Sequence, residues 1–233
     1  MYKNYIKRFL DIIISILILP FFLILLLIIG PIIYIEDRGH IFYNADRLGK
    51  NGKIFKMYKF RTMKENSEDI RNEDGSTYNG ENDPRVTKIG KILRKTSIDE
   101  VPQVINVLKG DMSFIGPRPD LPEHINVYED EEKRKLEVRP GITGFNQAYF
   151  RNSVLWKIRL KNDVYYVDNI SLWLDIKIIV KTISTVFKHT GVYINVQEES
   201  LNNETIKEGN KEYANKWKIW YKTIKMGYKI FSE

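Results

Sequence analysis

Two adjacent carboxylates, Asp99 and Glu100, are the residues of this sequence best suited to catalysis. They lie in the segment Ser97-Ile98-Asp99-Glu100-Val101-Pro102-Gln103, upstream of a Gly/Pro-rich loop that carries Arg118. A carboxylate can attack phosphorus as a nucleophile, and Mg²⁺ can screen the charge between the carboxylate and a phosphate. The pattern therefore indicates a site that handles phosphate.

Two interpretations of the segment around Asp99 are open. If Ser97 caps a helix, Ser97 and Glu100 form a capping box, and both acids have only a structural role. Pro102 favours a helix that begins at Asp99, because the N–H groups of the first turn are unpaired in any case. We expect Asp99 at the N-terminus of a helix over 99–109, where the helix dipole keeps it ionised and free N–H groups attract a phosphate.

Basic residues near rigid turns are the candidate phosphate ligands. Arg118 lies between Pro117 and Pro119, so its backbone is restricted on both sides and its guanidinium can bind a phosphate in a bidentate manner. Lys59 and Arg61 are two residues apart at the end of a predicted strand, so both can face one anion. The alternative for each is an ordinary solvated surface charge.

Composition limits the chemistry further. The chain has 233 residues, enough for one domain and a membrane segment, and its 37 basic and 30 acidic residues give a net charge of +7, which favours anionic partners. The absence of cysteine excludes thiol catalysis, disulfides and zinc–cysteine sites. The three histidines are scattered without metal-ligand spacing, so Asp and Glu must carry any acid–base step.

An uncharged stretch over residues 12–35 predicts a membrane-inserted helix, within a first segment of residues 1–38. It exceeds the about 20 residues that span a bilayer. Pro20 and Gly30-Pro31 interrupt it, and basic residues flank it on both sides, so both ends favour the cytoplasm. We therefore expect a re-entrant helix that bends and returns.

The remaining sequence predicts an α+β fold: a small, mostly helical cytoplasmic domain over residues 39–195 with a short β-hairpin. Strands at 41–44 and 54–60 flank a turn at 49–52, and a polar loop covers 64–82. The helices are expected at about 87–95, 99–109, 123–136, 153–166 and 171–189.

Two late segments have amphipathic patterns typical of interfacial helices. In 171–189 the apolar residues follow helical spacing, and a helix packed in the core is the equal alternative. The last segment, 196–233, is predicted to be a polar linker followed by a helix over 212–231 with an aromatic stripe and lysines over the rest of its surface. That pattern predicts a helix lying in the lipid headgroup layer.

The order of the motifs resembles that of the bacterial sugar transferases known as small monotopic phosphoglycosyl transferases. The resemblance covers residues 1–192 without a break. The matching motifs are Lys7-Arg8 with Asp11, Tyr58-Lys59-Phe60-Arg61-Thr62-Met63, Asp83-Pro84-Arg85-Val86-Thr87-Lys88-Ile89-Gly90, Ser97-Ile98-Asp99-Glu100-Val101-Pro102-Gln103, Asn106-Val107-Leu108-Lys109-Gly110-Asp111-Met112-Ser113, Gly116-Pro117-Arg118-Pro119 and Arg139-Pro140-Gly141-Ile142-Thr143-Gly144.

This resemblance implies a Mg²⁺-dependent enzyme of the bacterial cytoplasmic (inner) membrane, with its catalytic domain facing the cytoplasm. Asp99 would attack a UDP-sugar, release UMP and hold the phosphosugar, which undecaprenyl phosphate then accepts to begin assembly of a glycan. Asp99 would also bind Mg²⁺, and Glu100 would position or deprotonate the acceptor. The basic residues carried over as phosphate and nucleotide contacts are Lys59, Arg94, Arg118 and Arg151.

The sequence departs from the family in its membrane helix. The family breaks this helix at a Ser-Pro pair, expected near positions 23–24, where this chain has Leu23-Ile24; Pro20 lies about one turn earlier. The rival function is a catalytically silent membrane scaffold that recruits later glycosyltransferases, and the intact Asp99 and Glu100 pair argues against it. A nucleic-acid binder is disfavoured, because the basic residues lack interleaved aromatic platforms.

Overall fold

The structure, a computed structural model, describes residues 1–70, 78, 80, 83–150, 154 and 156–187. The chain divides into one unit of residues 1–194 and another of residues 195–233, and all described residues lie in the first unit. The predicted helix over 212–231 therefore lies outside the described residues.

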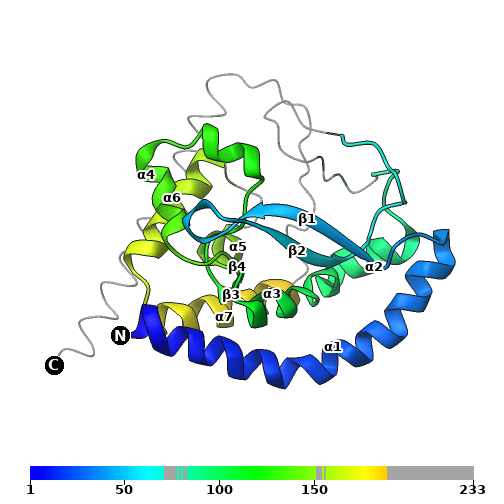
Figure 1. The fold of residues 1–233 in the computed structure, drawn as a ribbon, viewed down its shortest axis with the longest axis horizontal. Coiled ribbons are helices and arrows are strands. Elements are labelled where there is room, and N and C mark those ends of the chain that lie inside the picture. Colours follow the sequence, from blue (N-terminus) through cyan, green and yellow to red (C-terminus); the bar gives the residue numbers. More distant parts are fainter. Residues whose placement is uncertain (71–77, 79, 81–82, 151–153, 155, 188–233) are drawn as a thin grey trace. The chain divides into compact units, whose positions relative to one another are not determined.

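The uncharged N-terminal stretch forms one long helix, α1 (Lys7–Asp37), preceded by a π-helical turn at Tyr2–Ile6. Its 31 residues correspond to about 46 Å of helix. Pro20 and Pro31 lie inside the helix, which is continuous and curved (Figure 1). The expected interruption at Pro20 is therefore absent from the backbone, and a gradual curve takes its place. Figure 1 shows α1 running from α7 past α3 to α2.

Both ends of α1 are bound to the same folded unit. Near its start, Lys7 Nζ lies 2.6 Å from Asp175 Oδ2 on α7, and at its end Asp37 forms a bidentate ion pair with Arg61, with distances of 2.5 Å. Between these ends one face of α1 enters the core through Phe22, Ile29 and Ile33.

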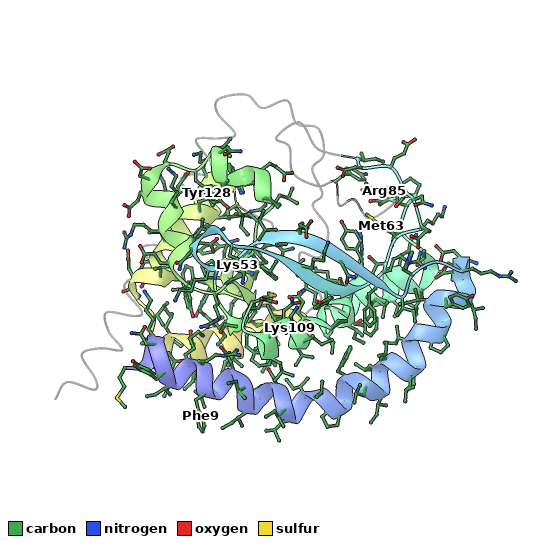
Figure 2. The ribbon with its side chains drawn as sticks, in the orientation of Figure 1. Phe9, Lys53, Met63, Arg85, Lys109 and Tyr128 are labelled. Atoms are coloured by element: carbon green, nitrogen blue, oxygen red, sulfur yellow. The ribbon has the colours of Figure 1, made fainter. Side chains whose placement is uncertain are left out.

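The opposite face of α1 is apolar and exposed. Figure 2 shows Phe9, 63% exposed, projecting from α1 away from the rest of the unit. By length and composition the helix is able to cross a membrane. The other large exposed side chains of this face include Ile16, Leu17, Phe21, Ile24, Leu27, Ile28 and Ile35.

The predicted β-hairpin is present. Strands β1 (Phe42–Leu48) and β2 (Ile54–Phe60) are antiparallel, and a 3₁₀ turn at Lys50–Gly52 joins them. Strand β1 extends four residues beyond the predicted 41–44, so that Leu48 pairs with Ile54. A second, parallel pair, β3 (Ser113–Ile115) with β4 (Gly141–Thr143), was not predicted, because three-residue strands show no usable alternation.

Most helices are shorter than predicted, and α2 has the predicted length. The prediction is closest for α2 (Lys88–Thr96) and α7 (Leu172–Phe187). The predicted helix at 99–109 divides into a 3₁₀ turn at Ile98–Glu100 and α3 (Gln103–Lys109). The remaining elements are 3₁₀ turns at Pro122–Asn126 and Arg134–Glu137, α4 (Asp130–Lys133), the unpredicted α5 (Phe145–Tyr149) and α6 (Trp156–Asp168).

Helix α7 confirms the core-packed alternative, and the interfacial alternative stays a prediction. Leu174 and Ile178 are buried, so one face packs in the core. Other apolar side chains of the same helix are exposed: Leu172, Trp173, Ile176, Ile179, Val180 and Ile183. The helix therefore has a buried face and an exposed apolar face.

Candidate active site

Asp99 and Glu100 lie in the 3₁₀ turn between α2 and α3. Ser97 begins this turn with φ 58°, a left-handed conformation, and its side chain makes no capping hydrogen bond there. The capping-box interpretation is therefore wrong. Helix α3 begins at Gln103 with Pro102 as its N-cap, so Asp99 precedes the helix by one turn instead of capping it.

Lys59 on β2 contacts this turn directly. Its Nζ lies 2.5 Å from Glu100 Oε1 and 4.0 Å from Asp99 Oδ2. Both acids thus share one cation, which donates a hydrogen bond to Glu100 and stays outside hydrogen-bond distance of Asp99. Lys59 and the two acids form a compact charged cluster, which we call the dyad cluster.

The fully buried side chain of Asn106 fixes the position of β2 against α3. Its Oδ1 accepts a hydrogen bond of 2.9 Å from the backbone N–H of Tyr58, and its Nδ2 donates one of 2.7 Å to the Lys56 carbonyl. Because Asn106 satisfies the backbone on both sides of Met57, β2 cannot slip by one residue without losing both bonds. Asn106 therefore keeps Lys59 next to the dyad.

The two acids have opposite electrostatic environments. Burial raises the pKa of Asp99, 9% exposed, to about 6, while the charges of Lys59 and Arg94 oppose this rise. Burial also raises the pKa of Glu100, but Lys59 and Arg118 outweigh it, so the net pKa lies below its usual value. The prediction that a helix terminus governs Asp99 is therefore wrong: burial dominates, and the carboxylate is still mostly ionised at pH 7.

Arg94 and Arg118 both act on the dyad cluster through their charge. Arg94, in the last turn of α2, donates from Nε to Thr62 Oγ1 over 2.9 Å and lowers the pKa of Asp99. Arg118 is exposed, and within the described part of the chain no hydrogen bond fixes its guanidinium. The fold therefore places three of the predicted phosphate ligands, Lys59, Arg94 and Arg118, around the two acids.

Two Gly/Pro segments support Arg118 by pairing their backbones. The Gly116 N–H donates to the Thr143 carbonyl and the Gly141 N–H to the Pro117 carbonyl, both over 2.9 Å. A Cβ on Gly141 would collide with the backbone of Gly116, so only glycine permits this close approach. The loop that carries Arg118 is therefore held on both sides.

Arg61 has a different environment from the one predicted. Its guanidinium forms the bidentate pair with Asp37 and also donates to the His40 and Met63 carbonyls. Because the N–H groups of Arg61 donate to these acceptors near the end of α1, Arg61 does not face the same anion as Lys59. Arg151 lies outside the described residues.

The sequence prediction missed Arg47. It pairs with Phe55 across the hairpin, and Tyr43 pairs with Lys59, so all four side chains share one face of the hairpin. Burial lowers the pKa of Arg47, and the neighbouring charge of Arg118 lowers it further. The alternation of Tyr43, Ala45 and Arg47 in the sequence is the signal that could have identified this arginine.

The described residues contain no group of three or more His, Asp or Glu side chains that could hold a metal ion. Mg²⁺, however, commonly binds one or two protein carboxylates together with substrate phosphates and water. Asp99 supplies one carboxylate of this type, and its Oδ2 does not accept a hydrogen bond from Lys59. The donor set therefore fits a Mg²⁺ ion that arrives with a phosphate substrate.

Comparison with known proteins gives consistent matches. The family model described as "Bacterial sugar transferase" matches residues 2–189. The chain is 39% identical over 193 residues to the UDP-N-acetylgalactosamine-undecaprenyl-phosphate N-acetylgalactosaminephosphotransferase of Aeromonas hydrophila, with 80% of this chain and 45% of that protein covered. It is 39% identical over 208 residues to the undecaprenyl-phosphate galactose phosphotransferase of Salmonella typhimurium, with 82% and 42% covered.

A third relative is closer in length. The chain is 39% identical over 186 residues to the uncharacterized sugar transferase EpsL of Bacillus subtilis, with 80% of this chain and 89% of EpsL covered. The chain spans less than half the length of the two phosphotransferases, so the similarity concerns one part of each of those proteins.

Proposed function

Because this chain belongs to the bacterial sugar transferase family, we propose that it transfers a phosphosugar from a UDP-sugar to undecaprenyl phosphate and releases UMP. The names of two relatives support the acceptor, since both are undecaprenyl-phosphate phosphotransferases, and one names a UDP-sugar as donor. In this proposal the product is the lipid-linked first sugar of a bacterial polysaccharide or glycoprotein glycan.

The observation that carries the proposal is the setting of Asp99. It is a buried carboxylate with a pKa of about 6, so at neutral pH it is mostly ionised and poorly solvated. A poorly solvated anion is a stronger nucleophile than one in bulk water. Lys59 and Arg94 lie close enough to lower its pKa, and the same charges would attract the diphosphate of the donor.

We propose a two-step transfer through Asp99. In the first step a carboxylate oxygen attacks the phosphorus bonded to the sugar, the phosphorus–oxygen bond to UMP breaks, and UMP leaves with that electron pair. In the second step a phosphate oxygen of the acceptor attacks the same phosphorus, the bond to Asp99 breaks, and the carboxylate is regenerated. Each step exchanges one phosphorus–oxygen bond for another.

The other residues of the site bind and orient in this proposal. Glu100, held by Lys59, is ionised and can accept a proton or a hydrogen bond from the acceptor phosphate. Arg118, whose backbone is fixed by the paired Gly/Pro segments, binds a phosphate in a bidentate manner. Arg47 lies beside it and extends the positive surface along the hairpin. Mg²⁺, held by Asp99, would neutralise phosphate charge when bound.

For the membrane we propose a monotopic arrangement of residues 1–38. Both ends of α1 contact the same unit, through Lys7 with Asp175 and through Asp37 with Arg61, so they lie on one side of the bilayer. The exposed apolar face of the curved helix then enters the lipid and returns, as in a re-entrant helix. UDP-sugars are cytoplasmic metabolites, so we place the site on the cytoplasmic face of the inner membrane.

The test is UMP release by the detergent-solubilised chain with Mg²⁺ and undecaprenyl phosphate across a panel of UDP-sugars. The proposal expects release with at least one sugar, its loss with EDTA, and its loss in Asp99→Asn. Trapping of radiolabelled phosphosugar on the protein in the absence of acceptor tests the aspartyl intermediate. No release with any donor would contradict the enzymatic function and favour a silent scaffold.

A further inference from the structure

A second group of buried charges lies apart from the dyad cluster. Lys135 Nζ is 2.7 Å from Asp120 Oδ2 and 2.7 Å from Asp163 Oδ2. The Tyr128 hydroxyl donates to Asp120 Oδ2 over 2.6 Å. Of the side chains of Lys135 and Asp163, only 3% and 4% are exposed. We call these four residues the lysine clamp; Figure 2 labels Tyr128 in the region where Figure 1 labels α4 and α6.

Burying the charges of the lysine clamp carries a large desolvation free energy. Three charged groups lose their hydration here, and apolar residues of similar volume often stabilise a protein as well as a buried ion pair does. None of the four residues is in the dyad cluster. The clamp instead joins separate parts of the chain: Asp120 follows the Arg118 loop, Lys135 lies in the 3₁₀ turn Arg134–Glu137, and Asp163 lies on α6.

Three observations connect the clamp to Arg118. Asp120 is two residues from Arg118, and its carbonyl accepts a hydrogen bond of 2.9 Å from the Leu48 N–H at the end of β1. Arg118, Asp120 and Lys135 line one small pocket, with Pro117 and Pro140. The charge of Arg118 also acts on Asp163. The end of the Arg118 loop is thus fixed through its backbone to β1 and through its side chain to Lys135.

We propose that Lys135 is a positioning residue: by joining Asp120 to Asp163 it fixes the far end of the 116–119 loop and orients Arg118 toward substrate phosphate. The near end of this loop is fixed by the backbone pairing of Gly116 with Thr143. With both ends held, the guanidinium meets a phosphate without first ordering its backbone. The catalytic part of this inference rests on the proposed function, and the mechanical part does not.

The catalytic part is tested with a double-mutant cycle of Lys135→Met and Arg118→Ala, measured as the specificity constant for UMP release. Misplacement of a binding group costs up to about 100-fold, and we expect that loss for Lys135→Met. If Lys135 acts through Arg118, the double variant is no slower than Arg118→Ala alone. Losses that multiply in the double variant overturn the inference.

The mechanical part is tested by hydrogen exchange of the intact protein. The Leu48 N–H bonds the Asp120 carbonyl, so in Lys135→Met we expect its exchange to be at least about 10-fold faster. The Arg61 N–H, bonded to the Ile41 carbonyl at the other end of the hairpin, should exchange at the unmodified rate. Unchanged exchange at Leu48 overturns the inference even when UMP release is impaired.

Two further variants keep the test decisive. Tyr128→Phe removes one hydrogen bond to Asp120 and no charge, so it replaces Lys135→Met in both measurements if the latter does not fold. Lys7→Met is the control, because Lys7 also forms a close ion pair with a buried aspartate, Asp175. Any loss in the specificity constant caused by Lys7→Met should multiply with the loss caused by Arg118→Ala. Hydrogen exchange of the Leu48 N–H should not change in Lys7→Met. If the unmodified protein releases no UMP, the proposed function fails, and hydrogen exchange alone decides the role of Lys135.

Discussion

Replacing Asp99, the proposed nucleophile, should inactivate the protein and at the same time stabilise its fold. Asp99→Asn keeps the size and shape of the side chain and removes its charge. The buried site disfavours that charge, and the amide resembles the protonated acid. We therefore expect a variant with at least about 10³-fold less UMP release and a higher free energy of unfolding at pH 8.

The size of the gain follows from the pKa of Asp99. The pKa rises from 3.8 to about 6 on folding, which at 1.36 kcal/mol per unit corresponds to about 3 kcal/mol that the ionised carboxylate costs the folded state. Because the folded-state pKa is raised, the penalty is nearly absent below pH 3.8, grows as the pH rises from 3.8 to about 6 and is constant above that. At pH 5 about half of it should remain.

The assay is denaturant unfolding in detergent micelles, with the unmodified protein and the variant compared at pH 8 and pH 5. Glu100→Gln is the matched control, because Lys59 and Arg118 lower the pKa of Glu100 and stabilise its ionised form. Glu100→Gln should therefore lower the free energy of unfolding at pH 8, whereas Asp99→Asn should raise it. Equal stability of Asp99→Asn and the unmodified protein at pH 8, or a gain that does not shrink at pH 5, would refute burial as the cause of the raised pKa of Asp99.

Four other predictions are open to direct measurement. The rate of UMP release should fall about tenfold per pH unit below pH 6, because Asp99 must be ionised to attack; a flat profile from pH 5 to 8 would contradict its role. Arg118→Lys should lose at least about 10-fold in the specificity constant for the UDP-sugar, because an ammonium cannot form the bidentate contact, and normal turnover would give Arg118 a structural role. Arg61→Gln should lower the free energy of unfolding by about 2 kcal/mol, since it removes the ion-pair partner of Asp37, while the KM for the UDP-sugar stays unchanged; a raised KM with normal stability would restore Arg61 to the substrate site. Deletion of residues 212–233 should weaken binding to anionic liposomes in a flotation assay, and undiminished binding would exclude a membrane role for this segment.

The local parts of the fold could be predicted from the sequence. The hairpin was predictable because alternation in β2 and the Gly-rich turn both act over a few residues. Helix α1 was predictable from its apolar composition alone. The 3₁₀ turn that carries Asp99 was not, because Pro102 is compatible with an N-cap as well as with the first helical turn, and the sequence does not distinguish the two.

Long-range pairing explains the remaining differences. In the sequence Arg61 resembles a phosphate ligand, but in the structure it is paired with Asp37, which lies 24 residues earlier. No local sequence pattern distinguishes Lys135 from the other lysines; only the fold shows Asp120 and Asp163 each 2.7 Å from its Nζ. Arg47 reaches Arg118 only through the pairing of β1 with a loop that is distant in sequence. Such partners depend on tertiary structure, which local patterns do not encode.

The attachment of α1 at both ends has a consequence for how the acceptor is found. Glu36 Oε1, at the end of α1, accepts a hydrogen bond of 2.7 Å from the Lys88 N–H at the start of α2, and α2 leads directly to the turn that carries Asp99. This hydrogen bond links the end of α1 to the segment that carries Asp99, so in the proposed membrane arrangement the depth of insertion of α1 sets the height of Asp99 above the bilayer. If the acceptor is the proposed undecaprenyl phosphate, it would then search for the site only in the two dimensions of the bilayer, at a fixed level, and no step would need to lift it into water.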